Sequence, residues 1–331
     1  MILDGSSPAA IEEAARALAA GELVAFPTET VYGLGADAGS DAAVAKIFAA
    51  KGRPSDHPLI VHVPDASAVT AFASDVPAFA QKLISALWPG PLTLILKRRE
   101  GVAAAAAGGH DTIGLRCPAH PVAHALLLAC ARATPPVHGL AAPSANKFGR
   151  VSPTTADHVS AEFGDALPVL DGGPCRIGIE STIVDCTRGV PVLLRPGVLT
   201  REQVEAASGE ALRSPGELAQ QAPRASGTLE SHYAPNARVR LMDAQALQTA
   251  LDLLGQDASG IAIYSRAIVR TPSDKLLRRR MPDDAAETAR QLFAVLREFD
   301  AQGVRLIWVE TPPDDPQWEG VRDRLQRASA G

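Results

Sequence analysis

Short apolar runs alternate with helical patterns along residues 1 to about 206, and this alternation constrains the fold more than any other feature of the sequence. Runs such as GELVAFP from residue 21 and PLTLILKR from residue 91 have the length and residue types of buried strands. Between them lie stretches such as DAAVAKIFAAKG from residue 41, whose apolar residues recur on one helical face. The alternation predicts an α/β fold in which helices and strands form layers.

A change of composition divides the chain. From Gly209 to Asn236 the sequence is rich in Pro, Gly, Ser, Gln and Arg without sustained periodicity, which is typical of a linker. Beyond it, strand-like runs such as VRLIWVE from residue 304 and helix-like runs predict a smaller βαβ-type unit. A length of 331 residues also favours two domains. We predict one domain over residues 1–208, a linker over 209–236 and a second α/β domain over 237–331.

Bulk composition excludes several classes of protein. The hydrophobic fraction of 46% is that of a soluble globular protein, and no apolar run approaches the ~20 residues of a membrane helix. Residues 1–20 form an amphipathic helical pattern rather than a signal peptide, so we expect a cytoplasmic protein. A net charge of −5 and an aromatic fraction of 4% argue against a general nucleic-acid binder. The basic run KLLRRR ending at Arg280 is compatible with an RNA patch, but a solvated strand or loop is the commoner explanation.

Residues that often carry metals or nucleophiles show no familiar arrangement. The four cysteines contain no C-x-x-C pair, so neither a zinc site nor a disulfide framework is indicated, and buried thiols are expected. The eight histidines show no metal-ligand spacing, and the G-x-S-x-G and H-E-x-x-H motifs do not occur. The remaining candidate site groups are cationic side chains and neutral hydrogen-bond donors, which are the groups that enzymes of phosphoryl or nucleotidyl transfer use.

The segment KGRPSDHPLIVHV, residues 51–63, concentrates charge around a short apolar run. Lys51 and Arg53 can close a helix, with Gly52 as its C-cap and Pro54 preventing continuation. Alternatively, Lys51 and Arg53 can clamp a polyanion such as a nucleoside triphosphate. The thirteen residues alone favour the helix-end interpretation, because each of their features is ordinary helix punctuation.

Three other loops place polar side chains and glycines beside strands: FPTETVYGLGADA from residue 26, LAAPSANKFGRVSPTT from residue 140 and DGGPCRIGIESTIVDC from residue 171. Hydroxyl and amide donors beside a lysine can bind phosphate oxygens, but the same residues often cap helices and turns. Arg53, Arg116 and Arg195 lie beside loops of this kind. Such arginines serve anion sites and also occur as surface charges, so the pattern leaves both interpretations open.

Eight motifs then agree in order: PTETVYGLG, KGRPSDHPLIVHV, WPGPLTLIL, RCPAHP, APSANKFGRVSPT, ESTIVD, LRPG and HYAP. Together they resemble the threonylcarbamoyl-adenylate synthase family, also called YrdC-like proteins. The match spans Gly21 to Gly197, and the linker and tail resemble the longer, two-domain members. The resemblance implies a YrdC-like domain with a twisted open α/β sheet, followed by a smaller Rossmann-like α/β domain.

The resemblance implies a nucleotidyltransferase. Such an enzyme joins L-threonine, bicarbonate or CO2, and ATP into threonylcarbamoyl-adenylate and releases pyrophosphate. Mg²⁺ is implied as a cofactor held mainly through the ATP phosphates, not by a protein cage. The product would pass to the transferase machinery that completes the t6A modification of tRNA. A direct tRNA contact is compatible with the resemblance, and no membrane partner is implied.

The resemblance also assigns residues to the site. Lys51 and Arg53 match the K-x-R motif that serves the triphosphate and are the expected catalytic cations, which favours the clamp. The implied ATP-site residues are Lys51, Arg53, His57, Thr112, Ser144, Asn146, Ser152, Arg195 and Tyr233. The implied threonine-site residues are Thr30, His62, Arg116, Ala142 and Ser181.

The linker departs from the family pattern. Typical members carry a basic Lys-Tyr-Arg stretch before His-Tyr, whereas this chain has Thr228, Leu229, Glu230 and Ser231. The resemblance therefore implies no ligand contacts for the linker residues before His232. Two other functions compete: an RNA-binding regulator on the same fold, and a carbamoyl-adenylate chemistry that starts from carbamoyl phosphate. The second ranks last, because the acylphosphatase and zinc-finger segments that accompany it are not in this sequence.

Overall fold

The structure is a computed structural model, and it describes residues 1–219, 221–229, 232–256, 258–271 and 273–331. The chain divides into two compact units, one of residues 1–148 and 152–228 and one of residues 149–151 and 229–331. Most of the predicted linker is thus counted with the first unit. Within the described residues, no helix has the length and apolarity needed to cross a membrane.

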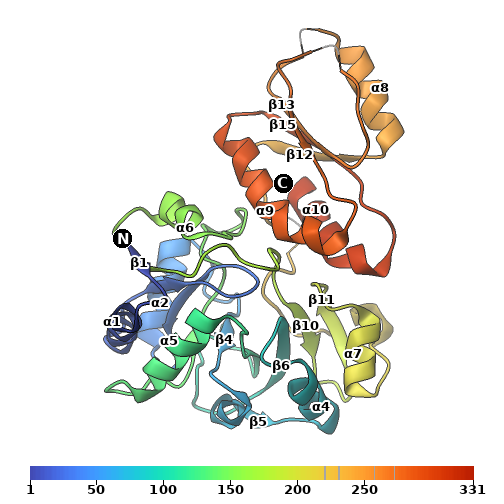
Figure 1. Ribbon diagram of the computed structural model, residues 1–331. Coiled ribbons are helices and arrows are strands. Elements are labelled where there is room, and N and C mark those ends of the chain that lie inside the picture. The colour runs from blue at the N-terminus through green and yellow to red at the C-terminus, as the bar shows by residue number, and fades with distance from the viewer. Residues whose placement is uncertain (220, 230–231, 257, 272) are drawn as a thin grey trace. The chain divides into compact units, whose positions relative to one another are not determined.

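The first unit is built on a mixed sheet of order β1-β9-β2-β3-β8-β4-β7-β6-β10-β11, with β5 paired to β6 (Figure 1). Its strands are β1 Ile2–Asp4, β2 Val24–Phe26, β3 Gly33–Asp37, β4 Ile60–His62, β5 Ala73–Asp75, β6 Leu92–Arg98, β7 Thr112–Arg116, β8 Leu140–Ala141, β9 Val169–Asp171, β10 Thr182–Asp185 and β11 Val192–Arg195. The predicted α/β class is confirmed. One expectation was wrong: residues 1–20 do not form a single helix, because Ile2–Asp4 pairs in parallel with Val169–Asp171 before the helix begins.

Helices cover the sheet of the first unit. They are α1 Pro8–Ala19, α2 Asp41–Lys51, α3 Val69–Phe72, α4 Ala78–Leu87, α5 Pro121–Arg132, α6 Ala156–Phe163 and α7 Arg201–Ser208, with 3-10 turns η1 Ala66–Ala68 and η2 Pro215–Glu217. Val24 and Phe26 pack with α1 and α5, whereas Ala25 packs in the core that includes α2 and α4. Because neighbouring strand residues point to opposite faces, the two cores lie on opposite sides of the sheet.

Helix α2 ends as the sequence predicts. Ser40 caps its N-terminus by accepting a hydrogen bond from the Ala43 N–H at 3.2 Å. Gly52 caps its C-terminus in the left-handed conformation, at φ 64°. Lys51 is therefore fixed in the last turn of α2, at the start of the loop that leads to β4.

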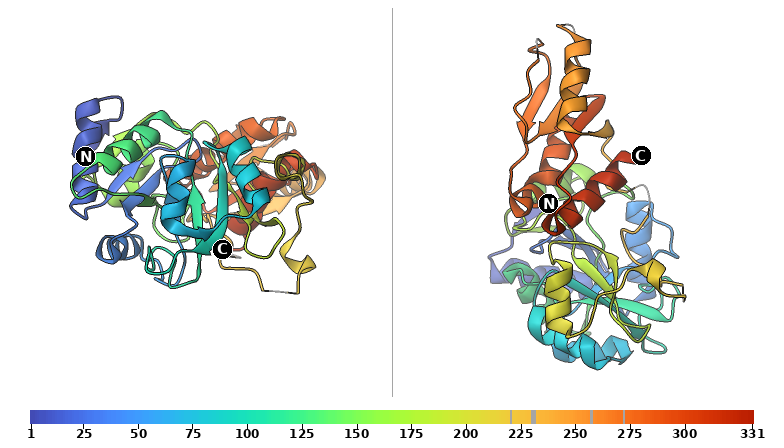
Figure 2. Two further views of the ribbon diagram at one scale, coloured as in Figure 1. Left: turned by 90° about the horizontal axis from the view of Figure 1, so that it is seen from below. Right: turned by 90° about the vertical axis from the view of Figure 1, so that its right-hand side faces the viewer.

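The second unit has a parallel sheet of order β12-β15-β13-β14. Its elements are β12 Arg238–Met242, α8 Ala244–Leu254, β13 Ile261–Ser265, β14 Leu277–Arg280, α9 Ala285–Ala301, β15 Leu306–Glu310, η3 Pro316–Trp318 and α10 Glu319–Ser329. Helices α9 and α10 lie side by side (Figure 2). The basic run forms the edge strand β14, where Arg279 pairs with Glu298 and Arg280 with Asp283, so the solvated-strand interpretation is confirmed.

Candidate functional site

One face of the central sheet carries His62 and the strand β7, which ends at Arg116. Val61 belongs to the α2 and α4 core, so its neighbours Ile60 and His62 point to the opposite face. The strand register places Gly114 between Ile60 and Ile95 on that same face. A Cβ on Gly114 would lie 3.5 Å from Ile60 Cγ1 and 3.3 Å from Ile95 Cδ1. Glycine at this position therefore leaves the space between the two isoleucines free of a side chain.

Arg116, the last residue of β7, is held from three sides. Its Nη1 donates to Thr30 Oγ1 at 2.8 Å, its Nη2 to Glu29 Oε1 at 2.6 Å, and its Nε to the Gly90 carbonyl at 3.2 Å. Arg116 is 4% exposed, so it is not a surface charge. The structure thus brings together Thr30 and Arg116, two of the predicted threonine-site residues. It also adds Glu29, which the sequence analysis did not place in the site.

His62 lies beside Arg116, because His62 and Arg116 are register partners in the parallel pair β4 and β7. Its side chain is buried and meets the Phe26 ring edge-on at 6.0 Å. Burial and the nearby Arg116 charge lower the pKa of His62 to about 3, so the ring is neutral at physiological pH. Among the described residues its Nδ1 has no hydrogen-bond partner. The neighbouring Ala142 holds the sheet together through its N–H, which donates to the Ile60 carbonyl at 2.9 Å.

The burial of His62 predicts acid sensitivity. In the unfolded chain His62 takes up a proton near pH 6.5, whereas the folded protein resists this until about pH 3, so the free energy of unfolding should fall as pH drops through this window. Above pH 6.5 the contribution is constant. We expect urea midpoints measured between about pH 7 and 5 to decline less in His62→Gln than in the unmodified protein. An identical decline in both proteins would contradict the burial of a neutral His62.

Lys51 and Arg53 form a second, equally buried group. Lys51 Nζ donates to the Ser144 carbonyl at 2.7 Å and also to the Asn146 carbonyl, which ties α2 to the loop after β8. Burial and the Arg53 charge lower the pKa of Lys51 well below its usual range. Arg53 donates to the Pro58 carbonyl at 3.1 Å and lies over the Phe148 ring. Lys51 and Arg53 are only 3% and 8% exposed. Cations that merely close a helix are normally exposed to solvent, so the helix-end interpretation does not explain this burial.

The remaining members of this second group lie close by. The His57 ring meets the Phe148 ring edge-on at 5.5 Å, and the pKa of His57 is lowered by partial burial and by Arg53. Ser152 Oγ donates to Glu180 Oε1 at 2.5 Å. Glu180 is buried and, like Glu29, was not predicted as a site residue.

Ser181 and Arg195 meet at the ends of β10 and β11. Arg195 Nη2 donates to the Ser181 carbonyl at 2.9 Å and to its Oγ at 3.1 Å. Ser181 Oγ also lies 2.7 Å from Thr93 Oγ1 on β6. Arg195 Nη1 donates to the Ser226 carbonyl at 2.9 Å, so the end of the predicted linker reaches this arginine. The predicted ATP-site arginine and a predicted threonine-site serine are therefore in direct contact.

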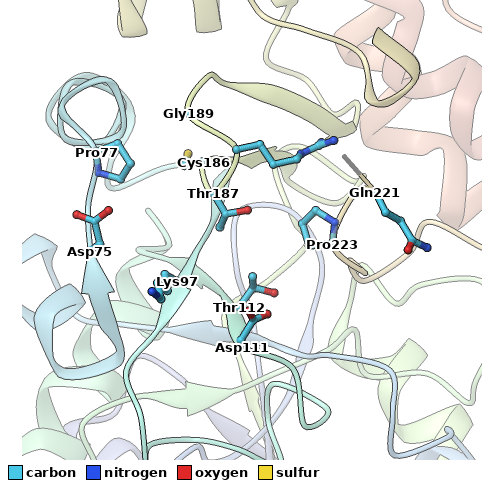
Figure 3. Close-up of a pocket in the computed structure, with 11 residues that line it drawn as sticks. Asp75, Pro77, Lys97, Asp111, Thr112, Cys186, Thr187, Gly189, Gln221 and Pro223 are labelled. Carbon is cyan, nitrogen blue, oxygen red and sulfur yellow. The ribbon is translucent and has the colours of Figure 1, made fainter. Parts of the chain in front are cut away.

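Thr112 lies apart from these groups and lines a cavity of about 530 Å³ (Figure 3). It is the first residue of β7 and Arg116 the last, so about 13 Å of strand separates them. Lys97 lines the cavity from β6, Thr187 from the turn after β10, and Gln221 and Pro223 from the predicted linker. In Figure 3, Thr112 and Pro223 lie on neighbouring sides of the hollow.

Tyr233 belongs to the second unit. It has a positive φ of 61°, stacks on the Phe293 ring at 5.5 Å between centroids and lies under the Arg324 guanidinium. The other predicted ATP-site residues belong to the first unit. Of the four residues at which the linker departs from the family pattern, Glu230 and Ser231 lie outside the described residues.

All four cysteines are buried and free of disulfides. The predicted burial of all four cysteines is confirmed, and burial raises the pKa of Cys117 to about 11 and of Cys130 to about 12. Across the described part of the chain, no three His, Cys, Asp or Glu side chains gather to hold a metal ion.

Comparison with known proteins identifies the family. The profile of the Sua5/YciO/YrdC family, described as telomere recombination, matches residues 16–197, and that of the threonylcarbamoyl-AMP synthase C-terminal domain matches residues 199–330. A threonylcarbamoyl-AMP synthase of Pyrococcus abyssi is 38% identical over 93% of this chain and 91% of its own. The chain belongs to the threonylcarbamoyl-AMP synthase family. The family resemblance predicted from the motifs is thus confirmed.

Other members of the threonylcarbamoyl-AMP synthase family agree over the whole length. A Bacillus subtilis relative is 37% identical, covering 97% of this chain and 93% of its own. The crystal structure of Pyrococcus abyssi Sua5 complexed with L-threonine matches with a TM-score of 0.87 at 37% identity, over 98% of this chain and 95% of that one. A double alanine variant of the same protein matches with a TM-score of 0.88 at 36% identity, over 99% and 96%. The predicted two-part fold is confirmed by these matches.

Proposed function

We propose that this protein is an L-threonylcarbamoyladenylate synthase, an enzyme of the nucleotidyltransferase type. It makes threonylcarbamoyl-AMP and pyrophosphate from L-threonine, bicarbonate or CO2, and ATP. The observation that carries the proposal is the buried Arg116 beside His62, in a chain whose full-length relatives bear this enzyme's name. The structure of the Pyrococcus abyssi relative with L-threonine supports the choice of amino acid.

Threonine would bind around Arg116. A guanidinium has five N–H donors, and the described contacts of Arg116 use three of them, so two remain for the substrate carboxylate. We expect the bidentate contact as a whole to contribute about 1.5–3 kcal/mol. The neutral His62 offers its Nδ1 to the substrate hydroxyl, and Thr30 and Ser181 place the amine. Ala142 shapes the site beside His62.

ATP would extend from the cavity at Thr112 toward the buried cations. Its adenosine would occupy the 530 Å³ cavity, at the end of β7 opposite Arg116. Lys51, Arg53 and Arg195 would neutralise the phosphates. Phosphate charge beside Lys51 would also restore its protonated form, which burial disfavours.

Neutral donors would complete the ATP site. We assign His57, Ser144, Asn146 and Ser152 to phosphate and ribose contacts. Mg²⁺ bound to the phosphates supplies further charge neutralisation and makes pyrophosphate a better leaving group. Asn146 would meet the phosphates or the Mg²⁺ that they hold.

The reaction needs no protein nucleophile. The threonine amine takes up CO2 and loses a proton, which gives a carbamate. A carbamate oxygen bonds to the α-phosphorus as the bond from that phosphorus to the bridging oxygen breaks, and pyrophosphate leaves toward Lys51 and Arg53. The site acts by positioning and by charge neutralisation.

The product would pass to the transferase machinery of tRNA t6A synthesis, and we propose a cytoplasmic location on that basis. Direct tRNA binding is a weaker proposal. The basic strand β14 would be its surface, but two of its three arginines are already paired with carboxylates.

The test of the proposed function is pyrophosphate release from ATP with bicarbonate and Mg²⁺, with and without L-threonine, and with L-serine as a comparison. We expect release that depends on L-threonine and a labile adenylate product. ATP binding without release would instead favour a binding module, and tight, salt-sensitive tRNA binding would then favour the RNA-binding alternative.

A further inference from the structure

Glu29 is a buried carboxylate that the proposed reaction does not use. It lies in the loop between β2 and β3 and is 7% exposed. One of its oxygens accepts from Arg116 Nη2 at 2.6 Å, and the other accepts from the Ala119 N–H at 3.1 Å. Its carbonyl accepts from the Ile177 N–H at 2.8 Å. Glu29 is therefore held by the N–H groups of Ala119 and Ile177 while its side chain accepts from Arg116.

Glu29 and Thr30 accept from different nitrogens of the Arg116 guanidinium. Glu29 takes one N–H of Nη2, and Thr30 takes one N–H of Nη1. One N–H remains on each of these two nitrogens, which is the number that a bidentate carboxylate contact uses. We propose that Glu29 is a positioning residue for threonine recognition, because it holds the Arg116 guanidinium so that these two N–H groups face the substrate carboxylate.

This inference rests on the proposed function and goes beyond it, because charge alone predicts the opposite effect. A carboxylate beside Arg116 weakens the attraction of that arginine for another carboxylate. If Glu29 only neutralised a buried cation, its removal would leave threonine binding unchanged or tighter. If Glu29 positions Arg116, its removal weakens threonine binding, because misplacement of a binding group by about 1 Å can cost about 100-fold.

The experiment measures the KM for L-threonine and the KM for ATP in Glu29→Gln and Glu29→Asp, by pyrophosphate release. In Glu29→Gln we expect the KM for L-threonine to rise by about tenfold or more, with the KM for ATP within about twofold. Glu29→Asp keeps the charge but shortens the reach, so an intermediate rise is expected. A KM for L-threonine that is unchanged or lower in both variants overturns the inference. If Glu29→Gln does not fold, Glu29→Asp decides alone.

A matched control exists in the second unit. Glu310 is also buried and accepts from an arginine, Arg266 Nη2 at 2.6 Å, from Ser265 Oγ at 2.6 Å and from the Ala267 N–H at 2.8 Å. Glu310→Gln should lower the thermal midpoint without changing the KM for L-threonine. The unmodified protein separates the two ideas. If it shows no threonine-dependent release, the proposed function fails. If its release is normal and the KM for L-threonine is unchanged or lower in both Glu29 variants, only the positioning role is rejected.

Discussion

Pyrophosphate release should fall by a factor of about 100 to 1,000 when Lys51 or Arg53 is replaced by alanine, because each would remove a preorganised cation from the leaving phosphates. Both side chains are buried within the first unit, so their charges act with little screening by solvent. The loss should appear in kcat more than in the KM for L-threonine, since the pyrophosphate carries the developing charge.

Lys51 also has a structural role that the experiment must separate. Its Nζ joins α2 to the carbonyls of Ser144 and Asn146, so Lys51→Ala should lower stability as well. Thermal midpoints therefore accompany the kinetics. Lys46→Ala is the matched control, because Lys46 lies on the same helix but is exposed and pairs with Glu22. Near-normal turnover in both Lys51→Ala and Arg53→Ala would reject the clamp.

Local pattern was enough to find most strands of the first unit but not all of them. The predicted run GELVAFP contains β2 and the run PLTLILKR contains β6, because buried strands need consecutive apolar, β-forming residues. Strand β1 was missed because its pairing partner is Val169–Asp171, and nothing local reveals a partner so far along the chain. Strand β3 was also missed, because its two glycines are unfavourable in a strand pattern. Gly35 is required there because a Cβ would lie 2.8 Å from the Phe26 ring.

The site was predictable as a set of residue types and not as an arrangement. The sequence left Arg53, Arg116 and Arg195 open as surface charges or site residues, and their burial decides against the surface. Glu29 was not predicted as a site residue, because its ion pair with Arg116 forms only when the fold places β7 beside the loop that follows β2. Thr112 and Arg116 lie at opposite ends of β7. The family motifs assign both residues to the site but do not show this separation.

Replacing Arg116 by alanine should raise the L-threonine concentration for half-maximal release by about 10- to 150-fold, which corresponds to the ~1.5–3 kcal/mol of a charge-assisted hydrogen bond. The ATP dependence should change little, because the adenosine is assigned to the cavity at Thr112, about 13 Å along β7 from Arg116. Arg116→Lys should show most of the same defect, since lysine keeps the charge but lacks the planar fork.

Stability is the competing explanation for the Arg116 variants. Arg116→Ala leaves Glu29 buried without its partner, which costs about 3–5 kcal/mol in other buried ion pairs. Arg266→Ala makes the same break in the second unit by leaving the buried Glu310 without its arginine. We therefore expect Arg266→Ala to lose stability while its threonine dependence stays normal. If Arg116→Ala and Arg116→Lys also keep a normal threonine dependence, Arg116 does not bind the substrate carboxylate.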